Sequence, residues 1–309
     1  MEYKATRDGY GDALVELGKI DEKVVVLDAD LSGSTKSAKF NKSFSNRFFN
    51  MGIAEANMAG VAAGMALCGL KPYASSFAVF ITGRAFEIVR QSICYQNLHV
   101  VLCGSHSGIS VGEDGGSHQA IVDIAVMRAL PNMKVVVPAD YNETVLAVKA
   151  TLNMDGPVYI RTSRAKSPVF IEKSKFELGR FDLLKNGNDA VIFACGMMSY
   201  IALEVSELLE KDKKHVAVVN ASSIKPIDEE LTLKLAKQTG RVFTVEEHSV
   251  IGGLGGAICE FLAGNYPVRV ERIGLNDVFG QSGTKEDLFC SYGFTKEAIA
   301  ERILKGLNG

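Results

Sequence analysis

Two histidines and two acidic residues stand among glycines in one short segment of the chain. Residues 104–119 read GSHSGISVGEDGGSHQ. Glycine lets the backbone approach a ligand and adopt positive φ angles without steric cost. Imidazoles titrate near pH 7, so His106 and His118 are suited to moving protons to and from a bound substrate. A merely flexible surface loop has no need of two histidines, and we therefore predict a functional loop.

A single glutamate begins an otherwise apolar stretch that has the period of a helix. Glu55 follows the residues NMGIA and precedes a run rich in alanine, glycine and methionine. A carboxylate near a helix N-terminus is favoured by the helix dipole, so Glu55 could simply match that dipole. If Glu55 is buried, it could instead share a proton with a ligand nitrogen. Both interpretations stay open at this level.

A third polar segment follows directly after a run of apolar residues. Residues 28–35 read DADLSGST and come after VVVL. Ligands of parallel-sheet domains bind at the carboxyl ends of the strands, which favours a binding segment here. Asp, Ser and Gly also favour helix caps and turns, so a purely structural cap is an equal alternative.

The usual phosphate-loop and metal-site patterns do not occur. The sequence has no G-x-x-x-x-G-K-[ST] motif, and GGLGG at residues 252–256 lacks the third glycine of a dinucleotide-binding motif. The five histidines show neither H-x-x-x-H nor H-E-x-x-H spacing. We therefore expect no metal site built by this chain alone.

The elements that must position these segments alternate between strands and helices. Apolar, β-branched runs at residues 24–30, 99–105, 134–139 and 157–163 predict strands. Between them, the helical period predicts helices over residues 54–68, 82–95, 118–130 and 142–154. Strands that are apolar on both faces and separated by helices indicate a parallel sheet covered on both sides.

A second alternating series follows a charged stretch in which the periodicity lapses. Strands are expected at residues 189–195, 215–221, 241–247 and 267–273, and helices at 198–211, 228–238, 254–263 and 295–307. The sequence thus predicts an α/β protein with two doubly wound domains. We place the first domain at residues 1–170, a linker at 171–188 and the second domain at 189–309.

The composition of the whole chain excludes several classes of protein. Lys plus Arg total 34 against 36 for Asp plus Glu, and the net charge of −2 gives no basic surface for nucleic acid or an anionic membrane. No apolar stretch approaches the roughly 20 residues that cross a bilayer, and the first residues do not resemble a signal peptide. The six cysteines form no C-x-x-C motif, which favours free thiols in a reducing compartment. We expect a cytoplasmic protein.

Taken together and in order, these segments resemble the C-terminal half of a transketolase. GEDGGSHQ at residues 112–119 is similar to the family's GEDGPTHQ, and NMGIAEANMAG to its glutamate helix. Shorter similarities are SFAVF, ATR and ADL, which begin at residues 76, 5 and 29. The resemblance covers essentially the full chain. It implies a thiamine-diphosphate (pyrimidine-binding) domain followed by a smaller transketolase C-terminal-like domain.

The resemblance also implies contacts with the cofactor. Glu55 would hydrogen-bond N1′ of the aminopyrimidine of thiamine diphosphate, which promotes loss of the thiazolium C2 proton. Phe77 and Phe80 would stack on the pyrimidine ring. Leu31 would pack near the cofactor beside Asp30.

A second set of implied contacts concerns the substrate. His106 and His118 would hydrogen-bond substrate oxygens and move protons as the C2–C3 bond of the donor breaks. Asp114 would bind a substrate hydroxyl. Three further residues would hold the sugar phosphate at the pocket mouth, where arginine supplies paired donors: Arg7, Ser34 and Arg164.

The sequence departs from the family pattern in places. Gly83 stands where many relatives carry a tyrosine against the pyrimidine. Family members hold the diphosphate and its Mg²⁺ through a separate N-terminal domain with a GDG…N pattern, and this sequence has no GDG triplet. The resemblance therefore implies a partner, an N-terminal transketolase subunit that carries the diphosphate and Mg²⁺ site, and self-association into a 2+2 heterotetramer.

The implied function is that of a subunit of a split transketolase. It would transfer a two-carbon ketol unit from xylulose 5-phosphate to ribose 5-phosphate or erythrose 4-phosphate, a reaction of the pentose phosphate pathway. One alternative is the matching half of a 1-deoxyxylulose-5-phosphate synthase, or a β subunit of a 2-oxo acid dehydrogenase. Another is a non-catalytic regulatory subunit that keeps the fold.

Overall fold

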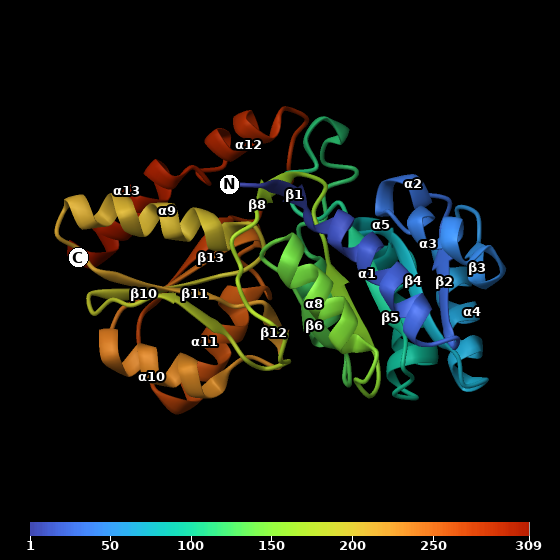
Figure 1. Cartoon of the computed structure of the whole chain (residues 1–309). Helices are drawn as coiled ribbons and strands as arrows, with labels where there is room; N and C mark the ends of the chain where they lie inside the picture. The colour runs from blue at the N-terminus through green and yellow to red at the C-terminus, as the bar shows by residue number, and fades with distance from the viewer. Residues whose placement is uncertain (309) are drawn as a thin grey trace.

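The computed structural model describes residues 1–308, and its first domain is built on a seven-stranded sheet (Figure 1). The strand order is β12-β6-β7-β5-β4-β2-β3. All neighbouring strands are parallel except β12, which is antiparallel to β6. These strands are β2 (Val24–Asp28), β3 (Phe48–Asn50), β4 (Lys71–Phe77), β5 (Val101–Ser105), β6 (Lys134–Val136), β7 (Val158–Arg161) and β12 (Ser223–Lys225). Every residue of β2 and β5 is buried, as expected of strands covered on both faces.

Helices cover both faces of this sheet. On one face, Tyr10 and Leu14 of α1 and Val148 of α8 are fully buried against the strands. On the other face, Met58 of α4 and Ile124 of α7 are equally buried. The helices of the first domain are α1 (Thr6–Ile20), α2 (Ser32–Thr35), α3 (Ala38–Ser43), α4 (Glu55–Leu67), α5 (Ala78–Gly83), α6 (Phe86–Ile88), α7 (Asp123–Ala129) and α8 (Tyr141–Thr151).

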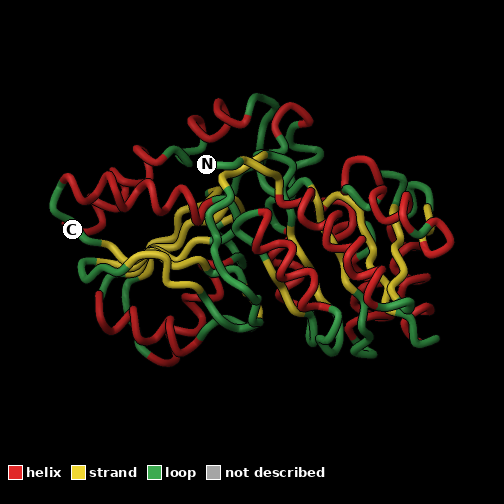
Figure 2. Tube along the Cα trace, in the orientation of Figure 1, coloured by secondary structure: helices red, strands yellow, loops and turns green. Residues whose placement is uncertain are grey.

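The second domain has a five-stranded sheet with the order β14-β13-β10-β11-β9, in which only β9 is antiparallel. Its strands are β9 (Asp182–Lys185), β10 (Ala190–Ala194), β11 (Val216–Asn220), β13 (Val242–Ser249) and β14 (Val270–Leu275). Its helices are α9 (Met198–Lys211), α10 (Glu229–Thr239), α11 (Leu254–Asn265), α12 (Lys285–Ser291) and α13 (Lys296–Asn308). Figure 2 shows strands between layers of helices in both domains, with α9 and α13 on one face and α10 and α11 on the other.

The two domains are joined by a shared sheet and a shared hydrophobic core as well as by the connecting chain. β12 follows β11 of the second domain and adds the outermost strand to the sheet of the first domain, where Ser223 pairs with Val136. A separate two-stranded sheet joins β1 (Tyr3–Ala5) to β8 (Lys166–Pro168). One hydrophobic core cluster contains residues of both domains, among them Leu102 and Phe193.

The predicted fold class, α/β with two doubly wound domains, is confirmed, and two of the expected helices differ. A single helix over residues 82–95 is wrong. Instead α5 begins at Ala78 and ends at Gly83, and a π-helical turn (Val89–Cys94) follows α6. Glycine is a poor helix former, which accounts for the break at Gly83. The helix expected from residue 118 begins only at Asp123, because Ala120 forms backbone bridges to Ser107 and Gly108 instead.

The parallel strands end level with one another at one edge of the first sheet. Asp28 at the end of β2 is in register with Asn50 of β3 and with Ser75 of β4. Phe77 at the end of β4 is in register with Ser105 of β5. The segments that follow these strands therefore meet at one edge, where ligands of such folds bind.

Candidate active site

Glu55 is the first residue of α4 and lies buried at the carboxyl edge of the sheet. Its side chain is 3% exposed. Its carboxylate accepts a hydrogen bond from Ser76 Oγ at 3.2 Å, and Nη1 of Arg84 lies 3.2 Å from both of its oxygens. Glu55 is therefore buried, as the second interpretation requires, and it also stands in the first turn of α4, where a carboxylate matches the helix dipole.

Two phenylalanines and two histidines form an aromatic group beside Glu55. Phe77 and Phe80 stack with ring centroids 5.7 Å apart and an interplanar angle of 18°. The ring of His106 stacks on Phe77 at 3.9 Å, and His118 meets the ring of Phe80 edge-on at 5.4 Å. The structure thus brings the loop histidines, which are 12 positions apart in the sequence, onto one pair of aromatic rings.

Gly83 lies just beyond this aromatic group. A Cβ atom at Gly83 would meet nothing within 4 Å. The guanidinium of the next residue, Arg84, lies 3.9 Å from the centroid of the Phe80 ring. Charge over an aromatic face is favourable, so Arg84 covers the ring at this point.

His106 is held in an unusual conformation and in a neutral state. Its φ angle is +58°, in the left-handed region that non-glycine residues seldom adopt. Arg7 Nη1 lies 3.1 Å from its Nε2, and Ser105 Oγ lies 2.9 Å from its Nδ1. Arginine can only donate, so these partners assign the proton to Nδ1. Burial, with the charges of Arg7 and Arg164, lowers the pKa of His106 to about 3.

A pocket of about 430 Å³ opens over His106. The residues that line it include six of the predicted site residues and two others: Arg7, Gly33, Ser34, Lys36, Phe77, His106, Asp114 and Arg164. Arg7 donates to the carbonyl oxygen of Ser34 at 3.0 Å, and Arg164 donates to Asp114 at 3.3 Å. The side-chain nitrogen Nε of Arg7 is buried without a hydrogen-bond partner among the described residues. Three cations therefore surround one pocket, and one of them has an unused donor.

The segment after β2 lies at the same edge, where the side chain of Asp28 is bonded within its own segment. Asp28 is fully buried and accepts hydrogen bonds from the backbone N–H of Leu31 and from Thr35 and Ser37. Burial raises the pKa of Asp28. Asp30 is exposed and accepts from the side chain of Asn50 at 2.9 Å. Neither Asp30 nor Leu31 lines the pocket over His106.

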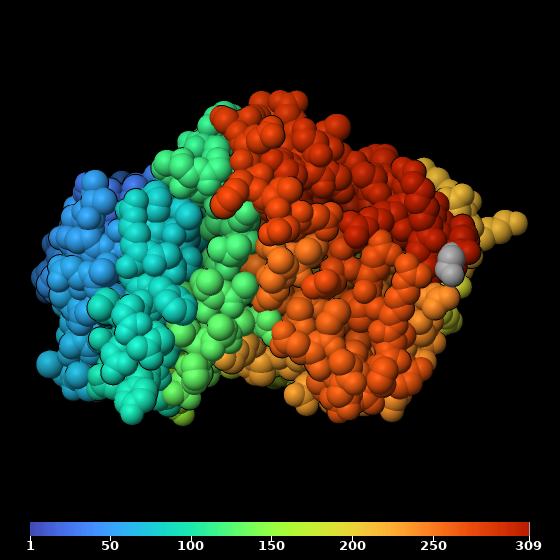
Figure 3. Space-filling model, turned by 180° about the vertical axis from the view of Figure 1, so that it is seen from behind, coloured from blue at the N-terminus to red at the C-terminus, as the bar shows by residue number. Residues whose placement is uncertain are grey.

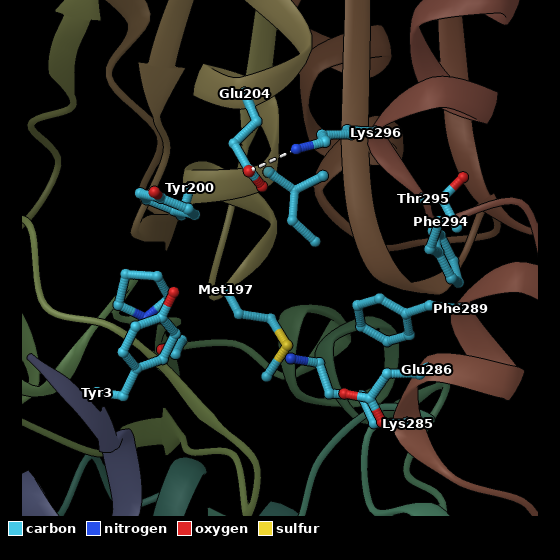
Figure 4. A pocket seen from close by; sticks show the side chains of 13 residues that line it. Tyr3, Met197, Tyr200, Glu204, Lys285, Glu286, Phe289, Phe294, Thr295 and Lys296 are labelled. Carbon is cyan, nitrogen blue, oxygen red and sulfur yellow. Dashed lines mark hydrogen bonds and ion pairs between the residues drawn. The ribbon is translucent and has the colours of Figure 1, made fainter. Parts of the chain in front are cut away.

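A second hollow of about 350 Å³ lies elsewhere, between β1, α9 and the C-terminal helices (Figure 4). Its walls are mainly apolar, with Tyr3, Met197 and Phe289 facing the hollow, and Lys296 pairs with Glu204 at 3.0 Å on its rim. None of the predicted site residues lines it. The pocket over His106 is more polar and is lined by six of the predicted site residues, whereas Glu55, Phe80 and His118 do not line it.

Within residues 1–308, no group of three or more His, Cys, Asp or Glu side chains could hold a metal ion. No helix in that range has the length and apolar character needed to cross a membrane.

Two side chains at the site were missed from the sequence. Lys36 lines the pocket over His106, and Arg84 contacts Glu55 and Phe80. The signal for Lys36 was its position directly after DADLSGST. Arg84 carried no comparable signal, because its contact with Glu55 spans 29 residues of sequence.

Comparison with known proteins places this geometry in a family. The family model described as "Transketolase, pyrimidine binding domain" matches residues 2–169, and "Transketolase, C-terminal domain" matches residues 179–299. A putative transketolase C-terminal section from Methanocaldococcus jannaschii is 47% identical over 98% of this chain and 96% of that protein. A 6-deoxy-6-sulfo-D-fructose transketolase subunit from a Clostridium strain is 40% identical over 97% of this chain and 93% of that protein.

Longer relatives and a solved structure complete the comparison. Human transketolase is 36% identical over 97% of this chain, which spans about half (48%) of that protein. The structure of a split-gene transketolase, described as an inactive beta4 tetramer, is 51% identical, with a TM-score of 0.92 and 98% of each chain covered. The chain therefore belongs to the transketolase family and carries the family's pyrimidine-binding domain followed by its C-terminal domain.

Proposed function

We propose that this chain is the C-terminal subunit of a split, thiamine-diphosphate-dependent transketolase. In this proposal it transfers a two-carbon ketol unit from xylulose 5-phosphate to ribose 5-phosphate or erythrose 4-phosphate in the cytoplasm. The observation that carries the proposal is the pocket in which Arg7, Lys36 and Arg164 face His106 and Phe77.

The cations of the pocket suit the phosphate of a sugar substrate. Arginine presents a planar fork of donors that matches phosphate oxygens, and lysine adds a point charge. The unpartnered Nε of Arg7 supports this assignment, because a buried donor without an acceptor is costly and an anion would supply one. The carbonyl oxygen of Ser34 already accepts from Arg7 and helps to orient it.

The residues at the carboxyl edge fit the pyrimidine end of the cofactor. Glu55 offers a buried carboxyl group to a ring nitrogen, and Phe77 and Phe80 offer two stacked aromatic rings. Asp30 and Leu31 lie next to this edge. When bound, thiamine diphosphate supplies the carbon nucleophile that accepts the ketol unit.

The loop residues of this chain would bind and polarise the substrate. His106 is neutral and carries its proton on Nδ1, so its Nε2 can accept a hydrogen bond from a substrate hydroxyl once Arg7 turns to a phosphate. His118 faces the same rings and could act on a second oxygen. Asp114, now paired with Arg164, could accept from a substrate hydroxyl.

A partner subunit is proposed for the diphosphate and Mg²⁺. The acidic groups described here do not gather into a metal site, so the fit that holds for the pyrimidine does not extend to the metal. The chain spans about half of human transketolase. We propose that a separate subunit, corresponding to the other half, provides the diphosphate and Mg²⁺ site. On α4, Gly60, Gly64 and Leu67 are exposed, which gives a flat apolar face for another subunit in a 2+2 heterotetramer.

Reconstitution tests this proposal. The chain is combined with the separate subunit that carries a GDG…N domain, thiamine diphosphate and Mg²⁺, and the conversion of xylulose 5-phosphate and ribose 5-phosphate is followed. We expect activity in the complex, none with either subunit alone, and loss of activity with Glu55→Ala. Full activity of the Glu55→Ala complex would refute the mechanism.

The same assay separates the alternatives. Consumption of pyruvate in place of the ketose phosphate would identify the synthase or dehydrogenase reaction. A complex that assembles but turns over neither donor would indicate a regulatory subunit.

A further inference from the structure

A buried glutamate of the second domain lies directly against the backbone of the loop that carries His106. Glu247 belongs to β13 and is 4% exposed. Its Oε1 accepts a close hydrogen bond from the backbone N–H of Ser110. The carboxylate also contacts the Gly108 position so closely that a Cβ atom there would overlap it. Gly108 has a φ of +72°, so both space and conformation require glycine.

We propose that Glu247 is a positioning residue that fixes the loop so that His106 faces the substrate pocket. The inference rests on the proposed function of that pocket. It assigns a part in the active site to the second domain, none of whose residues lines the pocket itself.

The end of the loop is fixed by a neighbour of Glu247. Arg161 of β7 is buried, and its Nη2 donates to the carbonyl oxygens of Glu247 and Ala120 at 3.0 and 3.1 Å. Its Nε donates to Asp123 at 2.8 Å. The backbone N–H of Gly108 donates to the carbonyl oxygen of Ala120 at 2.9 Å, which closes the loop on itself. The C-terminal side of the loop and β13 therefore share one buried guanidinium.

A second segment of the same domain holds the outer side of the loop. Ser282 Oγ donates to the carbonyl oxygen of Glu113 at 2.6 Å, and Gln119 donates to the carbonyl oxygen of Gln281 at 2.9 Å. A Cβ atom at Gly116 would lie 2.8 Å from the carbonyl oxygen of Gly280, so the two backbones are in close contact. Figure 3 shows the green loop lying directly against the red segment that contains these residues.

The conformation of His106 explains why such support is needed. A non-glycine residue in the left-handed region is strained and persists only where the surrounding structure determines it. Its side chain is held by first-domain residues, Arg7, Ser105 and Phe77. In the backbone that follows it, Ser107 donates to the carbonyl oxygen of Thr162 at 3.2 Å and Ser110 donates to Glu247. Loss of the Glu247 contact would loosen the loop around Ser110 and let the strain at His106 relax.

The role proposed for Glu247 is that of a hydrogen-bond acceptor rather than a charge. Burial raises the pKa of Glu247, while Arg161, the hydrogen bonds from Ser110 and the charge of Lys285 oppose that rise. An amide oxygen in the same place would accept from Ser110 equally well. Glu247→Gln should therefore preserve the loop, whereas Glu247→Ala should release it.

Hydrogen exchange of the full-length chain measures this directly and needs no activity. For Glu247→Ala we expect exchange in residues 107–119 to rise about ten-fold, because one buried N–H loses its acceptor. Exchange in β4 should not change. Glu247→Gln should stay close to the parent chain, and Ser282→Ala provides a milder variant that opens the outer side of the loop.

Glu246 is the matched control. It is the neighbouring residue of β13 and is 1% exposed, but it accepts from the backbone N–H groups of Leu254 and Gly255 at 2.7 and 2.8 Å. Glu246→Ala should raise exchange at the start of α11 and leave residues 107–119 unchanged.

The reconstituted enzyme provides the functional readout. Glu247→Ala should lower kcat about ten-fold or more, and Glu247→Gln should restore it. Unchanged exchange in residues 107–119 of Glu247→Ala, or a Gln variant as mobile as the Ala variant, would overturn the inference. If the parent complex were inactive while the exchange pattern held, the proposed function would fail and the positioning contact would stand.

Discussion

Arg84 donates to both carboxylate oxygens of Glu55 at 3.2 Å while its guanidinium lies over the ring of Phe80. One side chain therefore covers both groups that are proposed to hold the aminopyrimidine. Arg84 is half exposed, whereas Glu55 is buried, so Arg84 is the partner that can move away.

This relationship predicts that Arg84 competes with the cofactor. Arg84→Ala should lower the melting temperature of the isolated chain, because it leaves the buried carboxylate of Glu55 with Ser76 as its remaining partner. The same change should tighten binding of thiamine diphosphate by the complex by about five- to ten-fold, measured by titration calorimetry. Arg90→Ala removes a nearby exposed arginine paired with Glu87 and serves as the control. Weaker cofactor binding by Arg84→Ala would mean that Arg84 contacts the cofactor instead.

The low pKa of His106 predicts that this ring does not titrate in the physiological range. Its resonances in a spectrum of imidazole-labelled protein, assigned with His106→Asn, should stay constant from pH 5 to 8. An unfolded histidine titrates near pH 6.5, well above the folded value of about 3. The contribution of His106 to stability is therefore present above about pH 6.5 and is lost as the pH falls towards 3. A His106 resonance that titrates near pH 6.5 would contradict the buried, neutral state.

The three cations of the pocket predict a specific kinetic change. Lys36→Gln and Arg7→Gln should raise the KM for a phosphorylated acceptor by about ten-fold or more, because each removes a charged donor to phosphate. The reaction with a free, unphosphorylated sugar should change much less. Lys39→Gln alters a nearby lysine that pairs with Asp12 outside the pocket and is the control. Equal effects on both acceptors would show that the cations do not bind the phosphate.

A buried ion pair predicts where the segment between the domains is fixed. Lys173 pairs with the fully buried Glu143 and with Asp182, both at 2.7 Å. Lys173→Ala should lower the free energy of unfolding by about 2 kcal/mol, because it leaves the buried carboxylate of Glu143 without its cation. The loss is limited because Glu143 keeps its hydrogen bonds to Asn220. Lys175→Ala, which removes an exposed lysine paired with Glu177, should have little effect. Denaturant unfolding of both variants measures the difference, and equal stability would refute a structural role for Lys173.

Local patterns in the sequence predicted most of the alternation of strands and helices, although not α1 or β4, and the segments at the carboxyl edge. They could do so because a buried strand appears in the sequence as a short apolar run, and a loop as a cluster of glycine and polar residues. The helix over residues 198–211 was predicted to the residue, since α9 has a regular apolar face. The loop histidines, Phe77, Phe80 and the buried Glu55 lie together in the structure, although their catalytic roles stay predictions. The domain boundaries at residues 170 and 188 likewise stay predictions.

Contacts between distant parts of the chain could not be predicted. Glu247 is 137 residues from Ser110, and no local pattern reveals that the two meet. Nothing in the sequence distinguishes Arg84 and Lys36 from other cationic residues. Only the fold places Arg84 against Glu55 and Lys36 at the pocket. The short strand β12 also escaped detection, because its three residues pair with a strand about 90 positions earlier.

That short strand limits how a gene for this family can be divided. A fragment that stopped before the second domain would lose β12 and leave β6 at the rim of its sheet, with a row of free N–H and C=O groups open to pairing with other chains. Such a fragment would tend to aggregate. We therefore expect a break outside this pair of domains to be tolerated better, because it keeps β12 with the sheet that it completes.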